Sequence, residues 1–283
     1  LISNNISKPV EVVSNMANLI GDGDYDNKID YDSNIVEIDV LIKSINNLSA
    51  KLEEQENLRK RLTTDISHEL RTPLTSIKGW SETLGYEGIT RDELDLGLGI
   101  IQDETERLIK LVEELLDFSR LSSDRIKLKI DTVDIKRLAI GVVNQLKVKS
   151  SEKDISLNVE FKTENIDLIQ GDKDRLRQVL INLIQNSIKF TDEGGFINII
   201  VSQDEEYTTM KVVDNGAGIE KENLEKVLDK FFQEDYNKAG SGLGLAISNE
   251  IVKLHGGKMI LNSKKGVGTS ITVKIKNTLI KSI

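Results

Sequence analysis

The sequence predicts a multidomain chain in which an all-α region, a coiled coil and a four-helix-bundle dimer, precedes an α+β domain built as a two-layer sandwich. Up to about residue 123, apolar residues recur at alternating spacings of three and four, the rhythm of packed helices. From about residue 126, short β-rich runs alternate with helical segments, which favours a sheet covered by helices. The length of 283 residues suits this division, because domains commonly span about 100–200 residues.

The N-terminal segment predicts two helices joined by a turn. Residues 2–20 form an amphipathic pattern that Pro9 is expected to interrupt, and the turn residues 21–24 end it. A second helix is expected after Ser33, with a charged run at 51–61 that we interpret as solvated helix faces. Its apolar a/d positions are Leu41, Ile45, Leu48, Leu52, Leu58, Leu62 and Ile66.

A third helix is expected after a break near residues 85–90. Its residues at spacings of four and three are Leu94, Leu98, Ile101, Thr105, Leu108, Val112 and Leu115. Two long helices joined by a short loop make an antiparallel hairpin. A single hairpin buries its apolar seam poorly, and a four-helix bundle of two copies buries it fully, so we predict a homodimer.

The C-terminal part predicts a sheet with helices on it. Strands are expected at 126–130, 155–161, 197–201, 210–213 and 270–275. Helices are expected at 135–149, 173–189 and 243–254.

Composition excludes several classes of function. The 38 Lys+Arg against 47 Asp+Glu give a net charge of -9, which argues against nucleic acid as the partner. The absence of cysteine excludes disulfides, thiolate catalysis and Cys-containing zinc sites. No stretch approaches the about 20 apolar residues of a membrane helix, which predicts a soluble fragment. The start at Leu1 in place of Met suggests a longer protein with an upstream segment.

The sharpest local signal lies at 65–74, within the second helix. Pro73 predicts a break or kink there, because it removes the backbone N–H that would bond the carbonyl of Glu69. A zinc-protease pattern would need a second His at position 72, which is Thr72. Glu69 can accept a proton from His68 and so raise the nucleophilicity of the other ring nitrogen.

A second cluster lies on the helix at 173–189. Asn182, Asn186 and Lys189 are spaced by four and three residues and share one face. The amide oxygen of an Asn suits Mg²⁺, and Lys189 supplies positive charge for a phosphate. Phe190 follows directly. Two exposed polar residues on an amphipathic helix are the alternative interpretation.

Two glycine clusters follow. Asp214 ends a strand and precedes the turn 215–219, where its carboxylate can accept a hydrogen bond from an exocyclic amine. The segment 240–245 opens a helix whose free N–H groups can bind phosphate. Its Gly-x-Gly-x-Gly spacing matches neither the dinucleotide fingerprint nor the P-loop.

The run from His68 to Thr75 resembles the H box of sensor histidine kinases almost letter for letter. This resemblance implies that His68 is the phosphoacceptor and that Glu69 assists proton removal during its phosphorylation. It also implies that Thr72 orients water for dephosphorylation of a partner response regulator, which would receive the phosphoryl group on an Asp.

The later motifs, in their order, resemble the N box, the glycine boxes and the F box (230–232) of the Bergerat-type ATPase fold that histidine kinases share with gyrases and heat-shock ATPases. The resemblance implies ATP and Mg²⁺ as cofactors, with Asn186 on the metal, Asp214 on adenine and 219–240 as a mobile lid. The nucleotide-binding residues that it implies are Asn182, Asn186, Lys189, Phe190, Asp214, Gly216, Gly218, Ile219, Gly240, Ser241, Gly242, Leu243, Gly244 and Thr269.

The match has departures. Gln233 stands where many F boxes carry an Arg, with Lys238 as the candidate substitute, and the lid is short. Ser187 replaces the commoner Ala and Phe190 the commoner Tyr. We interpret His255, before Gly256-Gly257, as part of a helix C-cap.

The N-terminal helix pair resembles a HAMP linker, which implies a transmembrane sensor upstream and places the chain on the cytoplasmic face of the cell membrane. The predicted domains are a HAMP linker at 1–53, a dimerisation and phosphoacceptor hairpin at 54–123 and an ATP-binding domain at 124–283. The predicted function is that of a sensor histidine kinase, and two alternatives are considered beside it. One is a non-enzymatic scaffold or pseudokinase, and the other is an ATPase of the same fold without a phosphoacceptor.

Overall fold

The computed structural model describes residues 2–31, 35–122, 128–230, 232 and 242–277. Its internal contacts divide the chain into two compact units, Leu1–Thr72 and Pro73–Ile283, each described by itself. None of the described helices carries an apolar stretch long enough to cross a membrane.

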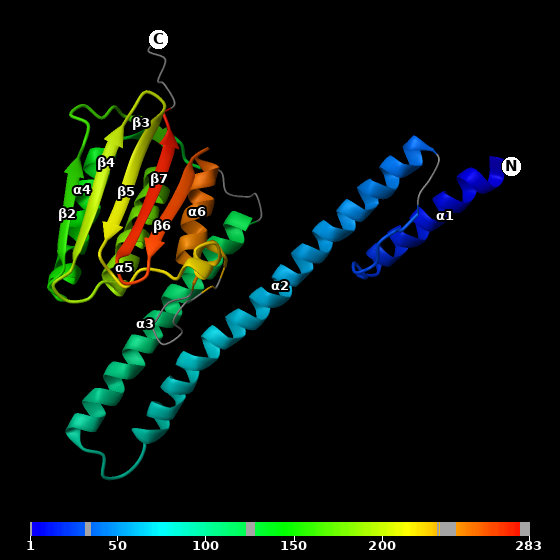
Figure 1. The fold of residues 1–283 in the computed structure, drawn as a ribbon. Coiled ribbons are helices and arrows are strands. Elements are labelled where there is room, and N and C mark those ends of the chain that lie inside the picture. The colour runs from blue at the N-terminus through cyan, green and yellow to red at the C-terminus, as the bar shows by residue number, and fades with distance from the viewer. Residues whose placement is uncertain (1, 32–34, 123–127, 231, 233–241, 278–283) are drawn as a thin grey trace. The chain divides into compact units, whose positions relative to one another are not determined.

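Both N-terminal helices form, as α1 (Ile2–Gly21) and α2 (Val36–Thr83) (Figure 1). The interruption expected at Pro9 is wrong, because α1 runs through it, and α2 likewise continues through Pro73 without a break. A proline removes one backbone hydrogen bond, and these helices of 20 and 48 residues retain the bonds of their other turns.

A small core joins α1 to α2 within the first unit. Met16, Ile29 and Ile42 are buried together. The segment between the helices is held by Asn46, whose amide both accepts from the N–H of Ile29 at 2.9 Å and donates to its carbonyl at 3.0 Å. Ser49 is buried and donates to the carbonyl of Tyr25 at 2.9 Å. These paired contacts fix the connecting segment on α2.

The second unit begins with the end of α2, the predicted loop and α3 (Arg91–Ser122). Thr90 and Glu93 form a capping box at the start of α3: the carboxylate accepts from the N–H of Thr90 at 2.9 Å, and the Thr90 hydroxyl accepts from the N–H of Glu93 at 3.3 Å. Near the loop the helices lie close, since a Cβ on Gly97 would be 2.7 Å from Cε3 of Trp80.

A five-stranded sheet in the order β2-β4-β5-β7-β6 forms the C-terminal domain, and Figure 1 shows α4, α5 and α6 together on one of its faces. The strands of this sheet are β2 (Ser156–Phe161), β4 (Phe196–Gln203), β5 (Tyr207–Asp214), β6 (Lys258–Lys264) and β7 (Gly268–Lys276). The helices are α4 (Ile135–Ser151), α5 (Lys173–Phe190) and α6 (Gly244–Leu254). Two short 3-10 helices, η1 (Lys221–Asn223) and η2 (Lys226–Leu228), follow β5. Only β2 and β4 are parallel; the other neighbours in this sheet are antiparallel.

The core lies between the sheet and its three helices. Alternate residues of β4 and β7 point inward and are buried, as the strand period of two requires. On α5 the buried residues are Leu176, Val179, Leu180, Leu183, Ile184, Ser187 and Ile188, spaced as on one helix face. Ser187 is the polar member of this set.

The strand predicted at 126–130 is wrong in its position. Residues 128–130 have no strand, residues 126 and 127 lie outside the described residues, and the strand here is β1 (Asp131–Val133). It pairs antiparallel with β3 (Ile169–Gly171) in a separate two-stranded sheet. The strands β3 and β6 were not predicted from the sequence.

Candidate functional site

Asp214, the last residue of β5, carries the most constrained carboxylate of the predicted site. Its side chain is 8% exposed. Oδ2 accepts from the hydroxyl of Ser187 at 2.7 Å, and Oδ1 accepts from the N–H groups of Gly216 at 3.0 Å and Thr269 at 3.1 Å. A carboxylate offers about four acceptor positions, so one remains for a ligand donor.

The turn after Asp214 is wedged between α5 and the β6–β7 hairpin. The N–H of Ala217 donates to the carbonyl of Phe190 at 3.0 Å, and a Cβ on Gly216 would lie 2.5 Å from that oxygen. Gly218 has φ +66°, and a Cβ there would lie 2.1 Å from the carbonyl oxygen of Lys264. Both positions therefore require glycine, one for close approach and one also for backbone conformation.

Ile219 and Thr269 belong to the same corner of the domain, where the end of β5 and the turn after it are hydrogen-bonded to β7 and β6. The N–H of Ile219 donates to the hydroxyl of Ser263 at 2.9 Å. That hydroxyl also donates to the carbonyl of Gly268 and lies 2.8 Å from the hydroxyl of Thr269. Five of the predicted residues, from β5, its turn, α5 and β7, thus come together: Phe190, Asp214, Gly216, Gly218 and Thr269, with Ile219 at the edge.

Asn182 faces α6 within the protein. Its amide donates to the hydroxyl of Ser248 at 2.9 Å, and a Cβ on Gly244 would lie 2.3 Å from its amide oxygen. The contact fixes the first turn of α6, where the glycine-rich segment ends, against the middle of α5. Leu243 is fully buried, so its side chain belongs to the core.

Asn186 and Lys189 lie one and two turns further along α5. Asn186 is half-buried, and no hydrogen bond to its amide occurs within the described part of the chain. The ammonium of Lys189 lies 4.6 Å from the ring centroid of Phe190. An amide oxygen and a cation on one helix face suit a metal ion and a phosphate.

Thr191, which the sequence analysis did not single out, sits beside this corner. It is buried, and its hydroxyl has no hydrogen-bond partner among the residues that the structure describes. A Cβ on Gly216 would lie 3.0 Å from that hydroxyl oxygen. A buried hydroxyl without a partner is costly, and a polar ligand would satisfy it. Its position directly after Lys189-Phe190 is the sequence signal that could have found it.

His68, Glu69 and Thr72 lie together on α2, in the unit Leu1–Thr72. His68 and Thr72 are exposed and Glu69 is half-buried. The hydroxyl of Thr72 donates to the carbonyl of His68 at 3.4 Å, a long bond. An exposed imidazole with a carboxylate next in the chain is available to a reactant from solvent.

Part of the predicted site lies outside the described residues. Gly240, Ser241, Gln233 and Lys238 belong to that part, as does the end of the expected lid. The described start of the lid contains η1 and η2, with Val227 buried. At Lys230, where this described part ends, burial lowers the pKa of the ammonium group, and the charge of Glu250 partly opposes that shift.

The prediction that His255 belongs to a helix C-cap is confirmed, because His255 is the C-cap of α6. It follows α6, its Nε2 accepts from the N–H of Asp172 at 2.9 Å, and its Nδ1 lies 2.8 Å from the carbonyl of Ile251. These bonds require the neutral tautomer that carries its proton on Nδ1.

Three family models match the chain in succession. Residues 1–54 match the HAMP domain, residues 58–124 match the His Kinase A (phospho-acceptor) domain, and residues 171–279 match the histidine kinase-, DNA gyrase B- and HSP90-like ATPase.

Two curated relatives are similar to most of the chain. The chain is 32% identical over 284 residues to the sensor histidine kinase YclK of Bacillus subtilis, covering 96% of this chain and 59% of that protein. It is 35% identical to the sensor histidine kinase WalK of Bacillus subtilis, covering 83% of this chain and 39% of that one. The chain therefore spans about half the length of these relatives.

The chain is also similar to solved structures. The histidine kinase ThkA in complex with the response regulator protein TrrA aligns with a TM-score of 0.66 at 29% identity, covering 82% of this chain and 67% of that one. Full-length ShkA in complex with AMPPNP aligns with a TM-score of 0.60 at 28% identity, covering 78% and 46%. With a HAMP, a phosphoacceptor and a kinase-type ATPase domain in one chain, the protein belongs to the two-component sensor histidine kinases.

Proposed function

We propose that the protein transfers the γ-phosphoryl group of ATP to His68 and then to an Asp of a separate response regulator. The observation that carries the proposal is the corner around Asp214, where a buried carboxylate keeps an acceptor position beside the unpartnered hydroxyl of Thr191. An exocyclic amine of adenine supplies the matching donor. The relative ShkA, solved with AMPPNP, supports the choice of an adenine nucleotide.

The residues around this corner would hold the rest of the nucleotide. We assign Asn186 as the protein ligand of Mg²⁺ and Lys189 as a phosphate partner, because they extend along α5 from the corner. The remaining assigned contacts are those of the sequence analysis: Asn182, Phe190, Gly216, Gly218, Ile219, Gly240, Ser241, Gly242, Leu243, Gly244 and Thr269. Bound Mg²⁺ would supply charge neutralisation of the phosphates.

In the first reaction, one imidazole nitrogen of His68 attacks the γ-phosphorus, the bond from that phosphorus to the bridging oxygen breaks, and ADP leaves. The proton on the other ring nitrogen goes to Glu69, which neutralises the imidazolium that forms. In the second, an Asp carboxylate of the regulator attacks the same phosphorus, the bond between that phosphorus and the His68 nitrogen breaks, and the imidazole leaves as it takes back the proton held by Glu69. ThkA was solved with a response regulator, which supports this partner. A phosphatase reaction would use Thr72 to orient water.

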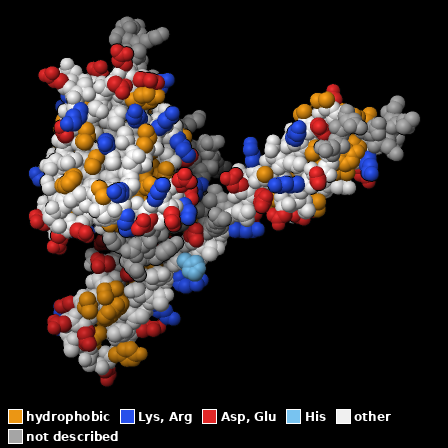
Figure 2. Space-filling model, viewed as in Figure 1, with side chains coloured by type: hydrophobic (Ala, Val, Ile, Leu, Met, Phe, Trp, Pro, Cys, Tyr) orange, Lys and Arg blue, Asp and Glu red, His pale blue; other side chains and the backbone are white. Residues whose placement is uncertain are grey.

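We also propose a homodimer built on the hairpin. Figure 2 shows hydrophobic side chains at the hairpin surface near its loop. Along α3, Leu98 is 51% exposed and Val112 is 46% exposed, at positions of the predicted seam. A second copy would cover this seam in a four-helix bundle.

The domain limits and the cellular site are part of the same proposal. We place a HAMP linker at 1–53, the phosphoacceptor hairpin at 54–123 and the ATP-binding domain at 124–283. The match to a HAMP model supports a location at the cytoplasmic face of a membrane, reached through an upstream sensor segment.

The test is ATP binding with and without Mg²⁺, measured beside label incorporation from γ-labelled ATP in the wild type and in His68→Gln. Label on the wild type alone, with equal ATP binding by both, is expected. ATP hydrolysis that persists in His68→Gln, with no label on the wild type, would indicate an ATPase without a phosphoacceptor. No ATP binding would indicate a scaffold.

A further inference from the structure

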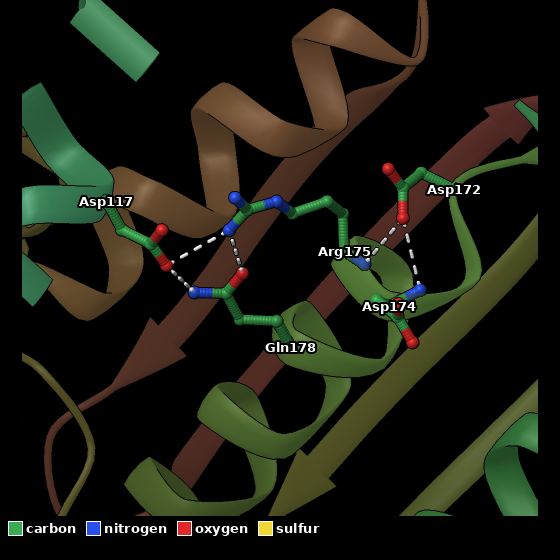
Figure 3. Close-up of polar contacts among 5 residues, drawn as sticks. All are labelled: Asp117, Asp172, Asp174, Arg175 and Gln178. Atoms are coloured by element: carbon green, nitrogen blue, oxygen red, sulfur yellow. Dashed lines mark hydrogen bonds and ion pairs between the residues drawn. The ribbon is translucent and has the colours of Figure 1, made fainter. Parts of the chain in front are cut away.

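An ion pair joins the phosphoacceptor hairpin to the ATPase domain. Arg175, in the first turn of α5, donates from Nη1 to Oδ2 of Asp117 on α3 at 3.0 Å (Figure 3). Gln178 donates to the same oxygen at 2.8 Å and accepts from Nη1 of Arg175 at 2.8 Å. The three side chains therefore form a closed triangle of hydrogen bonds, in which the two charged members are 25% and 22% exposed.

Asp172, the N-cap of α5, fixes the backbone at Arg175. Its Oδ1 accepts from the N–H groups of Asp174 and Arg175, both at 3.1 Å (Figure 3). Its Oδ2 accepts from the N–H of Lys129 at 2.9 Å, in the segment between α3 and β1. One buried carboxylate thus holds both the start of α5 and the chain that leads into the domain.

The ion pair of the triangle lies at the start of α5, away from the residue assigned to Mg²⁺. Arg175 and Asn186 are eleven residues apart on the same helix, which places them about 16 Å apart along its axis at about 1.5 Å per residue. The triangle therefore constrains how the domain sits on α3, and none of its three residues is among those assigned to ATP.

We propose that Asp117, Arg175 and Gln178 form a latch that holds the ATPase domain on α3 and opens before phosphoryl transfer. The inference rests on the proposed function. Transfer requires the γ-phosphorus within about 3–3.5 Å of the imidazole of His68, which is on α2. The latch ties the domain to α3, the hairpin helix that lacks His68. A partly exposed ion pair is weak enough to open repeatedly.

Charge reversal tests the latch in the whole chain. Asp117→Lys and Arg175→Glu each place like charges against each other, and the double variant restores an attractive pair of opposite polarity. Arg177→Glu is the matched control, because Arg177 is an exposed neighbour on α5 whose guanidinium bonds Gln145 within the same domain. The measurements are the initial rate of label incorporation from γ-labelled ATP, the affinity for ATP and the melting temperature.

Each single variant should raise the initial rate about fivefold, which corresponds to about 1 kcal/mol at about 1.36 kcal/mol per tenfold. The double variant should return toward the wild-type rate, and ATP affinity should stay constant throughout. Single variants with unchanged or lower rates, or a double variant without reversal, would overturn the latch. A wild type that takes up no label would instead count against the proposed function.

Discussion

The hydroxyl of Ser187 donates a 2.7 Å hydrogen bond to Oδ2 of Asp214, and both residues are buried. A side chain on the core face of α5 thereby fixes the orientation of a carboxylate at the end of β5. The other carboxylate oxygen is held by two backbone N–H groups. The substitution of Ser for the commoner Ala at this point of the N box therefore adds a third fixed donor to Asp214.

Replacement Ser187→Ala should weaken ATP binding several-fold and lower the free energy of unfolding by about 1 kcal/mol, because Asp214 loses one donor. Ser150→Ala is the matched control: Ser150 is also buried but donates to the carbonyl of Lys147. It should cost stability alone. Calorimetric titration with ATP and thermal unfolding give both quantities. Equal ATP affinity in the two variants would contradict a role for Ser187 at the site.

Replacement Asp214→Asn should reduce ATP affinity at least about tenfold. The amide carries one acceptor oxygen, and its NH₂ group would face the donors of Ser187 or of Gly216 and Thr269. Loss of one hydrogen bond to a charged group costs about 1.5–3 kcal/mol, and a tenfold loss of affinity corresponds to about 1.4 kcal/mol. Titration of the folded variant with ATP measures the change. Affinity within twofold of the wild type would remove Asp214 from the nucleotide site.

Replacement Gly218→Ala should destabilise the ATPase domain and weaken ATP binding together. Its φ is +66°, and the new Cβ would meet the carbonyl oxygen of Lys264 at 2.1 Å. Gly141→Ala is the opposite case, because Gly141 is an exposed residue within α4 with no atom within 4 Å of the added Cβ. It should stabilise the helix by about 0.5–1 kcal/mol. Thermal unfolding that shifts both variants in the same direction would refute this distinction.

Acid should destabilise the ATPase domain partly through Asp172. Burial raises the pKa of this carboxyl, but the N–H donors of Lys129, Arg175 and Asp174 and the charge of Arg175 outweigh it, so its pKa lies below 3.8. Its stabilising contribution is therefore complete above the unfolded pKa and is lost as pH falls through the folded value.

Urea unfolding between pH 3 and pH 7 should show this loss in the wild type below about pH 4. Asp172→Asn should be less stable at pH 7 and should lose less stability on acidification. Parallel pH profiles for the two proteins would show that Asp172 is not the group that titrates.

The helices were predictable because apolar residues repeat at spacings of three and four over long stretches. Leu94, Leu98 and Ile101 repeat over many turns, and α3 forms with the expected loop before it. The short strands were not predictable in the same way. The three residues of β1 bury one side chain, and β6, at the edge of the sheet, contains alternate residues that are only half-buried.

Some residues of the site were recognisable from the sequence, and others were brought together only by the fold. Asp214 and the glycines around it were recognisable because each has a local sequence context. Asp117 and Arg175 are 58 residues apart in the chain, and neither belongs to a motif, so only the fold brings them together. The role of Ser187 comes from its buried hydrogen bond to Asp214, which no residue pattern shows.

The most direct measurement of the central claim is the identity of the phosphorylated residue. The chain has two histidines, His68 and His255, so His68→Gln and His255→Gln form a matched pair. After incubation with γ-labelled ATP and Mg²⁺, the label should be lost in acid and retained in base, and the phosphorylated peptide should contain His68. We expect label on the wild type and on folded His255→Gln, and none on His68→Gln. Acid-stable label, or label that remains on His68→Gln, would contradict the assignment of His68 as the phosphoacceptor.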